Sequence, residues 1–372
     1  MSSAIKHTGY MAQALQLARR GLYTTDPNPR VGCLLVKGDS IVGRGWHERA
    51  GSSHAEVNAL AEAGEAAKGS TAYVTLEPCS HQGRTPPCAD ALISAGVTQV
   101  VVAMQDPNPL VAGQGIERLR AAGISVEIGV LEQQAIALNP GFVSRMQCGR
   151  PWVRCKLAMS LDGRTAMASG ESEWISSDAS RQDVQRLRAR SSAVMTGVGT
   201  ILADNPSMNL RLSPAVLGIA GDIRQPLRVV LDRELQMPTN ARTLALPGQV
   251  VILTAKSEGQ GEWTSLEKAG ATIRTVKETN DHLDLEAVLG ALATLEMNEV
   301  LLETGARLSG AMLEAGLIDE LVIYAAPHIM GDSGLGLFHL PGLESIRDRI
   351  QLQFTDVRQI GDDLKITARP VV

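Results

Sequence analysis

The feature that most constrains how this chain can fold is one histidine and two cysteines with chemically matched neighbours, in His54-Ala55-Glu56, Pro78-Cys79 and Cys88. One imidazole and two thiolates supply three ligands for zinc, and a catalytic zinc site keeps its fourth position open for water. Glu56 lies two residues beyond the histidine, close enough to exchange protons with a water in that position. We therefore predict a zinc centre whose ligands are gathered from separate segments of one domain.

Each part of this pattern also has an ordinary explanation. A lone histidine is commonly a packed or surface residue, and a free cysteine is commonly a small core side chain. A structural zinc normally takes four protein ligands, and His81 is the other Cys or His at short spacing. The position of Glu56 and the prolines before both cysteines favour a catalytic site. The first half of the nucleobase deaminase signature, H-x-E followed by P-C-x-x-C, is matched, but eight residues, 80–87, separate the cysteines here.

Length and composition limit the alternatives. A chain of 372 residues is too long for one comfortable core, so we expect two domains. Only 3% of the residues are aromatic and the net charge is −5, which argues against a nucleic-acid partner. Five cysteines without a regular framework indicate a reducing, cytoplasmic location. No signal-peptide core and no apolar run of membrane length is present, so we expect no membrane partner; a homo-oligomer is left open.

Alternating helix and strand patterns predict a three-layer α/β/α domain over residues 1–149. The expected helices cover 9–22, 55–67, 88–95 and 116–122, and the expected strands cover 31–36, 41–46, 72–76, 99–104 and 125–130. In this pattern His54 precedes a helix, Cys79 follows the end of a strand, and Cys88 stands in the first turn of a helix behind a proline.

Proline and glycine near residues 139–151 mark a boundary, and a second α/β domain is expected over 150–372. Its expected strands cover 153–159, 193–196, 227–231, 249–253 and 300–303, and its expected helices cover 178–190, capped by Asp178, and the segment up to 315. Two glycine turns, 197–200 and 304–310, lead from strand to helix and would offer free N–H groups to the phosphates of a dinucleotide. Neither turn matches G-x-G-x-x-G, and glycine commonly just ends a strand.

Longer stretches of the sequence resemble one known family. They are residues 26–33, 54–57, 77–88 and 106–109 in the first half, and 156–164, 172–175, 202–206 and 303–308 in the second half. These motifs resemble the bifunctional riboflavin-biosynthesis deaminase/reductase over nearly the whole chain. The long loop between the cysteines, with its Gly-Arg-Thr-Pro-Pro run at 83–87, is similar to that family and unlike cytidine or tRNA-adenosine deaminases.

The resemblance implies two reactions in two domains. A cytidine-deaminase-like N-terminal domain would use zinc to deaminate a diaminopyrimidinone that carries a ribosylamino 5-phosphate. A dihydrofolate-reductase-like C-terminal domain would then use NADPH to reduce the ribosyl group to ribityl. The small-molecule partner is thus a phosphorylated pyrimidine, and the cofactors are Zn²⁺ and NADPH.

The resemblance also implies roles for individual residues. His54, Cys79 and Cys88 would bind zinc, and Glu56 would be the catalytic proton carrier. The residues implied for NADPH are Ala158, Trp174, Thr200, Asp204, Gly305, Ala306, Arg307 and Leu308. The residues implied for the substrate of the reduction are Ser172, Arg188, Met208, Arg211 and Glu303. Arg188 has a second interpretation as an ordinary exposed helix charge, and Arg233 is a candidate for the 2′-phosphate of NADPH.

Three further candidates follow from side-chain chemistry. Asn28 suits the amide edge of a pyrimidine, while His81 and Arg84, in the loop between the cysteines, suit the ring and the sugar phosphate. Each of the three is equally well explained as a turn cap or a solvated side chain. Two other functions compete with the bifunctional enzyme: a nucleic-acid base deaminase with an appendage, and a non-catalytic nucleotide-binding module stabilised by zinc. Glu56 argues against the module, because a structural metal has no use for a proton carrier.

Overall fold

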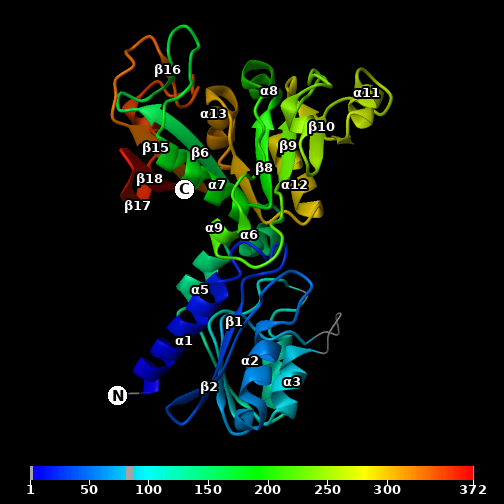
Figure 1. The fold of residues 1–372 in the computed structure, drawn as a ribbon, viewed down its shortest axis with the longest axis vertical. Helices are drawn as coiled ribbons and strands as arrows, with labels where there is room; N and C mark the ends of the chain where they lie inside the picture. Colours follow the sequence, from blue (N-terminus) through cyan, green and yellow to red (C-terminus); the bar gives the residue numbers. More distant parts are fainter. Residues whose placement is uncertain (1–2, 81–86, 110, 372) are drawn as a thin grey trace. The chain divides into compact units, whose positions relative to one another are not determined.

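The computed structural model describes residues 3–80, 87–109 and 111–371. The chain divides into two compact units, Met1–Gly149 and Arg150–Val372, coloured blue to cyan and green to red in Figure 1. Within the described ranges, the helices are too short or too polar to traverse a lipid bilayer.

The first unit is built on a five-stranded sheet with the strand order β2-β1-β3-β4-β5. The strands are β1 (Gly32–Lys37), β2 (Ser40–Trp46), β3 (Thr71–Val74), β4 (Gln99–Val102) and β5 (Ser125–Ile128). β1 and β2 form an antiparallel hairpin whose turn contains Gly38 at a positive φ of 62°, and β3, β4 and β5 are parallel. The strands predicted over 31–36 and 41–46 are therefore present, joined by this turn.

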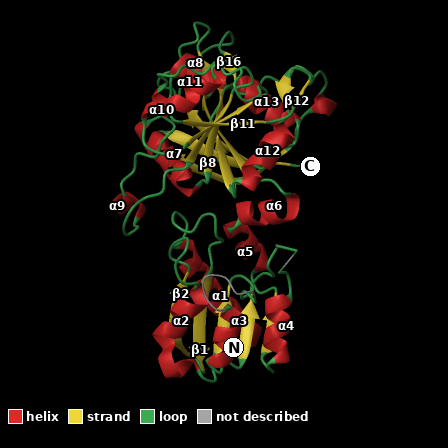
Figure 2. Ribbon diagram, turned by 90° about the vertical axis from the view of Figure 1, so that its right-hand side faces the viewer, coloured by secondary structure: helices red, strands yellow, loops and turns green. Residues whose placement is uncertain are grey.

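Helices cover both faces of this sheet, as Figure 2 shows. The helices are α1 (Ser3–Arg19), α2 (Ala55–Ala63), α3 (Cys88–Ser94), α4 (Gln114–Ala121), α5 (Glu132–Leu138) and α6 (Pro140–Cys148), with a 3₁₀ turn at Gly64–Ala67. Successive β1 side chains alternate between the two faces. Cys33 and Leu35 pack in one buried cluster with α2 and α3, and Leu34 packs in the other with α1. The predicted three-layer architecture is confirmed.

Three elements of the first unit differ from the sequence predictions. The first helix begins at Ser3 rather than at residue 9 and runs through Gly9, where an added Cβ atom would meet nothing within 4 Å. The segment 139–141, expected as a break, instead starts α6, with Pro140 at the first helical position where its missing N–H costs nothing. α5 was not predicted at all.

The second unit contains a nine-stranded sheet with the order β11-β10-β9-β8-β14-β6-β15-β18-β17. The strands are β6 (Trp152–Ser160), β8 (Ala193–Gly197), β9 (Leu227–Leu231), β10 (Val250–Thr254), β11 (Ala271–Thr275), β14 (Glu299–Leu302), β15 (Glu320–Ala326), β17 (Leu352–Ile360) and β18 (Asp363–Pro370). Neighbouring strands from β11 to β15 are parallel, and β18 and β17 continue the sheet antiparallel. Short strands β7 (Arg164–Ala166) and β16 (Leu335–Gly336) pair apart from it, as do β12 (Glu278–Thr279) and β13 (His282–Leu283).

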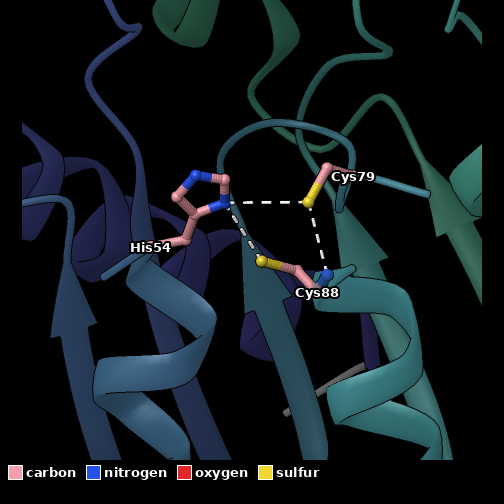
Figure 3. A group of neighbouring side chains, drawn as sticks. All are labelled: His54, Cys79 and Cys88. Carbon is pink, nitrogen blue, oxygen red and sulfur yellow. Dashed lines mark hydrogen bonds between the residues drawn. The ribbon is translucent and has the colours of Figure 1, made fainter. Parts of the chain in front are cut away.

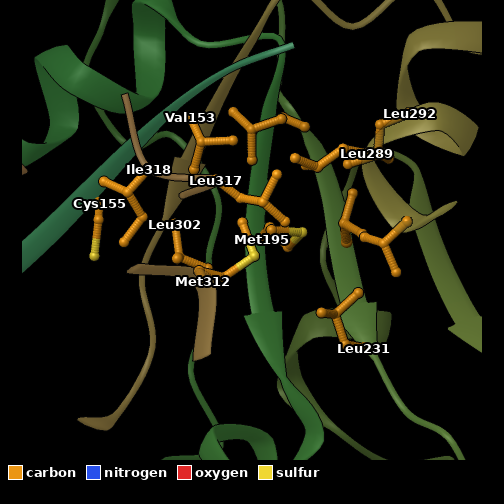
Figure 4. Packing of buried hydrophobic residues seen from close by; sticks show 14 of the residues in the cluster. Val153, Cys155, Met195, Leu231, Leu289, Leu292, Leu302, Met312, Leu317 and Ile318 are labelled. Carbon is orange, nitrogen blue, oxygen red and sulfur yellow. The ribbon is translucent and has the colours of Figure 1, made fainter. Parts of the chain in front are cut away.

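Two buried clusters hold helices against the two faces of this sheet. The helices of the unit are α7 (Asp178–Arg190), α8 (Val198–Asp204), α9 (Pro214–Leu217), α10 (Arg242–Ala245), α11 (Trp263–Lys268), α12 (Leu285–Thr294) and α13 (Ala306–Glu314), with a 3₁₀ turn at Ile346–Asp348. Leu302 of β14 packs with α12 and α13, as Figure 4 shows, and Leu301 packs on the opposite face with α7. The cap of α7 is Ser177, whose side chain accepts the N–H of Ser180, so the prediction that Asp178 caps this helix is wrong.

Candidate active sites

The predicted zinc ligands come from three elements that meet at one end of the first sheet. His54 precedes α2, Cys79 follows β3, and Cys88 is the first residue of α3. The Nδ1 atom of His54 lies 3.2 Å from the sulfur of Cys88 and 3.7 Å from the sulfur of Cys79 (Figure 3). The ligand atoms of the three side chains all lie within 4.8 Å of one another.

This geometry fits a zinc ion. Bonds of about 2.0 Å to nitrogen and about 2.3 Å to sulfur, at a tetrahedral angle, place the two ligand atoms about 3.5 Å apart. The observed nitrogen–sulfur separations of 3.2 and 3.7 Å lie on either side of that value. One nitrogen and two sulfurs leave the fourth tetrahedral position for water, as in catalytic rather than structural zinc sites.

The surroundings favour the metal-binding thiolate form at Cys79, whereas the hydrogen bond with Cys79 and burial raise the pKa of Cys88. Hydrogen bonding from Cys88, including its backbone N–H 3.3 Å from the sulfur of Cys79, lowers the pKa of Cys79 to about 4. The hydrogen bond to Cys79 in turn raises the pKa of His54. A ready thiolate beside the Nδ1 atom of an imidazole is the donor set that zinc prefers.

Glu56 occupies the first turn of α2, directly beside the ligand cluster. The residue is 3% exposed, and burial raises its pKa to about 7. A carboxyl group that gains and loses its proton near neutral pH suits a proton carrier. The start of α2 therefore positions both the histidine ligand, at its N-cap, and the acid–base group, in its first turn.

Asn28 is connected to the ligand cluster through the side chain of His47. Its Nδ2 atom is 3.1 Å from the Nε2 atom of His47, whose ring meets that of His54 edge to face with centroids 5.6 Å apart. His47 was not predicted as a site residue, because a single histidine at the end of a strand carries no motif. The candidates His81 and Arg84 lie outside the described residues.

Glu77 is a second residue that sequence reasoning missed. Its buried carboxylate accepts backbone N–H groups of Asp106, Gly113, Gly115 and Ile116, at 2.9 to 3.2 Å. These bonds hold the segment after β4 against the strand end that carries Cys79. The signal in the sequence is only that Glu77 stands two residues before a ligand, since its partners are backbone groups that any residue provides.

In the second unit, the two predicted glycine turns lie next to each other. β8 and β14 are parallel neighbours, so their carboxyl ends reach the same edge of the sheet. Gly197 precedes α8 and Gly305 precedes α13. A Cβ atom at Gly197 would lie 3.4 Å from the side chain of Leu308, which links the two turns directly.

The Gly305 turn has room for a ligand. Its φ of −80° is open to any residue, and a Cβ atom there would meet no protein atom within 4 Å. Neither backbone strain nor packing within the chain therefore requires glycine at this position. Because the turn opens a nine-residue helix, its free N–H groups suit the phosphates of a dinucleotide.

Arg188 and Glu303 form a two-pronged ion pair next to this turn. The guanidinium donates to both carboxylate oxygens at 2.7 and 2.8 Å, and a third N–H donates to the carbonyl of Asn209. Burial alone would raise the pKa of Glu303, but the charge and hydrogen bonds of Arg188, together with the charges of Lys156 and Arg211, outweigh burial, and the pKa is lowered. Since Arg188 is only 8% exposed, its interpretation as an ordinary exposed charge is wrong.

Lys156 was missed by the sequence analysis as a site residue. It lies on β6, where burial lowers the pKa of its ammonium group, and Glu303 and Arg188 are the charges that act on it most strongly. The signal was a lysine within a mostly apolar strand that also contains Arg154, and Lys156 was quoted only as part of a motif.

The remaining predicted residues are placed as follows. Ala158 is half-buried on β6, Thr200 and Asp204 lie on α8, and Ala306, Arg307 and Leu308 form the first turn of α13. Ser172 and Trp174 lie on the loop between β7 and α7, where Trp174 is 70% exposed with its ring 4.5 Å from the Arg181 guanidinium. Burial, with a contribution from Glu173, raises the pKa of Asp204, which places this loop beside the end of α8.

Two predicted residues and one candidate sit differently from the others. Met208 is 2% exposed and packs in a core cluster, so its side chain faces the protein interior. Arg211 is exposed and donates to the hydroxyl of Ser207 at 2.8 Å. Arg233 is paired with three carboxylates, those of Glu234, Glu278 and Asp281.

Comparison with known proteins decides the family. Residues 151–366 match the model of the RibD C-terminal domain, and residues 4–104 match the cytidine and deoxycytidylate deaminase zinc-binding region. The riboflavin biosynthesis protein RibD of Escherichia coli is 49% identical over 362 residues, which is 95% of this chain and 97% of that protein. The chain belongs to the RibD family.

Solved RibD structures share the whole fold. RibD of Acinetobacter baumannii is 44% identical and superposes with a TM-score of 0.91 over 100% of both chains. A diaminohydroxyphosphoribosylaminopyrimidine deaminase/5-amino-6-(5-phosphoribosylamino)uracil reductase of Thermotoga maritima is 31% identical, with a TM-score of 0.85 over 100% of both chains. The resemblance and the two-domain α/β fold are thus confirmed. The alternative of a nucleic-acid base deaminase with an appended domain is excluded, because the second half of the chain matches the RibD C-terminal domain.

Proposed function

We propose that each half of this RibD enzyme carries one of its two activities. The protein is a bifunctional deaminase and reductase of riboflavin biosynthesis, and thus both a hydrolase and an oxidoreductase. We assign the deaminase to residues 1–149 and the NADPH-dependent reductase to residues 150–372. The observation that carries the assignment is the convergence of His54, Cys79 and Cys88 beside Glu56, far in sequence from the paired glycine turns.

The deaminase substrate is a 2,5-diamino-6-ribosylamino-pyrimidinone 5-phosphate. When bound, zinc supplies a polarised water of lowered pKa in its open position. Glu56 would take one proton from the attacking water and pass it to the departing nitrogen. The second water proton would move to the neighbouring ring nitrogen, so that ammonia leaves and a carbonyl remains. The carboxamide of Asn28 faces the amide edge of the ring, and the candidates His81 and Arg84 remain proposals for the ring and phosphate.

The reductase substrate is the deaminated compound, 5-amino-6-(5-phosphoribosylamino)uracil. NADPH supplies the hydride when bound. The N–H groups of the Gly305 turn hold its phosphates, and the segments at Ala158, Trp174, Thr200 and Asp204 line it. The ammonium of Lys156 donates a proton to the ribose ring oxygen as that ring opens to the imine, and Glu303 orients the sugar. Arg211 binds the substrate phosphate, because Arg188 is already paired with Glu303.

Separating the two activities by mutation tests this assignment. Cys88→Ser should abolish ammonia release yet still oxidise NADPH when given the deaminated intermediate. Glu303→Ala should release ammonia and accumulate the unreduced product. If Cys88→Ser stays folded but loses both activities on their own substrates, one shared site must replace the two.

We also propose that the enzyme is a cytoplasmic homo-oligomer. Its site needs two reduced thiols, which a reducing compartment maintains. A group of exposed hydrophobic residues, called the β17–β18 apolar surface, supports self-association; it comprises Ile346, Leu352, Phe354, Val357 and Leu364. Exposed apolar patches of this kind mark interaction sites, and symmetric homo-oligomers are the commonest assemblies.

A further inference from the structure

A chain of hydrogen bonds links Asn28 to the backbone before the zinc ligand. The Nδ1 atom of His47 lies 3.1 Å from the carbonyl oxygen of Ser53, and its Nε2 atom lies 3.1 Å from the Nδ2 atom of Asn28. We propose that His47 is a positioning residue of the deaminase, which fixes the orientation of the Asn28 carboxamide toward the substrate ring. This inference rests on the proposed deamination.

The direction of each bond follows from the chemistry of its partners. A carbonyl oxygen can only accept, so the Nδ1 atom of His47 carries the hydrogen that Ser53 receives. In the neutral ring the Nε2 atom then has a lone pair and must accept from Asn28. Burial supports the neutral ring, since His47 is only 3% exposed.

Because Nε2 accepts, the amide of Asn28 has only one workable orientation. Its nitrogen must point to His47, since a reversed amide would set an oxygen against a lone pair. One N–H of Asn28 is used in this way, and the second N–H and the Oδ1 atom remain as an adjacent donor and acceptor. A lactam presents an N–H next to a C=O, and this edge pairs with such a carboxamide. A ring in which the N–H and C=O are exchanged, or in which one of them is absent, would leave polar groups of the site unpaired, which lowers the affinity.

The ring of His47 also touches that of His54, so support of the zinc ligand is the competing role. The two roles differ in what they affect. A residue that acts through Asn28 changes substrate binding and leaves the metal in place. A residue that supports His54 changes zinc content and therefore turnover.

Two matched substitutions separate the ring nitrogens of His47. In His47→Asn the side-chain nitrogen can take the place of Nδ1 and still donate to Ser53, but nothing replaces Nε2. In His47→Gln the longer side chain can bring an oxygen to the place of Nε2 and accept from Asn28. We expect His47→Asn to raise the KM of deamination roughly tenfold, the loss of about one buried hydrogen bond, with a smaller change in kcat. His47→Gln should stay within about threefold of the wild type.

Two controls complete the experiment. Zinc content and NADPH-dependent reduction of the deaminated substrate should be unchanged in both variants, which also shows that they fold. In an Asn28→Ala background, His47→Asn should cause no further rise in KM, because its effect passes through Asn28.

Four results would overturn the proposal. They are an unchanged KM in His47→Asn, equal losses in both variants, a zinc-poor His47→Asn, and additive effects with Asn28→Ala. Failure of the wild type to release ammonia from the diaminopyrimidinone phosphate would refute the deaminase itself and this role with it. The first four results, obtained with an active wild type, refute only the role of His47.

Discussion

At the scale of single residues, the deaminase site proposed above separates three groups that would hold metal from one group that would move protons. His54, Cys79 and Cys88 present one nitrogen and two sulfurs toward a common point. Glu56 is buried beside them with a pKa of about 7, so it can both accept and release a proton near neutral pH. Metal binding and proton transfer should therefore be separable by substitution.

We expect Glu56→Gln to keep its zinc and to lose deamination by about 10²-fold or more, because an amide of the same shape cannot carry protons. Cys79→Ser should instead lose the metal, since it removes one of three protein ligands. Metal analysis together with an ammonia-release assay distinguishes the two. A zinc-loaded Glu56→Gln enzyme with substantial activity would move the acid–base role to another group.

The sequence could predict residues whose chemical type carries the signal, and it missed those defined by their surroundings. The three proposed zinc ligands could be predicted because imidazole and thiols near a glutamate are a distinctive set, and the structure brings them together. Lys156 was missed as a site residue because its importance comes from burial beside Glu303, which a local pattern does not show. Glu77 was missed because it binds backbone N–H groups, which are the same in every sequence.

At the scale of elements, strand ends and helix starts fix the sites, and close packing joins them to the loops. Gly115 in α4 is an example, because a Cβ atom there would lie 1.9 Å from the carbonyl oxygen of Pro78, next to Cys79. α4 can approach the strand end this closely only with hydrogen at that position. Contacts of this kind join elements that are far apart in sequence, and a local sequence pattern does not show them. The sequence patterns therefore predicted the buried strands better than the helices α5 and α6 or the exposed strand β17.

Gly115→Ala should therefore displace the segment that carries Cys79. We expect a loss of stability of about 1–3 kcal/mol, the usual cost of overpacking, together with lower zinc content and deaminase activity. Gly290→Ala in α12 is the matched control, because a Cβ atom there meets nothing within 4 Å. Thermal unfolding and metal analysis of both variants make the comparison. Equal behaviour of the two would show that α4 can move without disturbing the metal site.

Gly305→Val tests the cofactor turn in the other unit. Since the added side chain meets no protein atom within 4 Å at its Cβ position, folding should be unaffected. The KM for NADPH should rise roughly tenfold or more, because the side chain would stand where phosphate approaches the backbone. Deamination measured in the same preparation is the internal control. An unchanged KM would make this turn no more than the entry to α13.

At the scale of the whole molecule, the β17–β18 apolar surface exposes hydrophobic side chains that neither proposed active site uses. Val357, 56% exposed, stands opposite Ile366 on the neighbouring strand. We expect Val357→Asp to shift the enzyme toward a lower oligomeric state, because a buried unpaired carboxylate opposes association. Sedimentation at several protein concentrations measures this, with Val216→Asp, the same substitution at a 50% exposed valine of α9, as the charge control. A wild type that sediments as a monomer would refute self-association.

The ion pair of Arg188 with Glu303 has a further consequence for how the reductase gathers its substrate. The two charges cancel, which leaves the ammonium of Lys156 and the guanidinium of Arg211 as neighbouring positive charges that this pair does not neutralise. The doubly anionic phosphate of the substrate is then drawn in over a distance that shrinks as salt is added, from about 30 Å at 0.01 M to about 10 Å at 0.1 M. Capture of the deaminated intermediate should consequently slow with rising ionic strength.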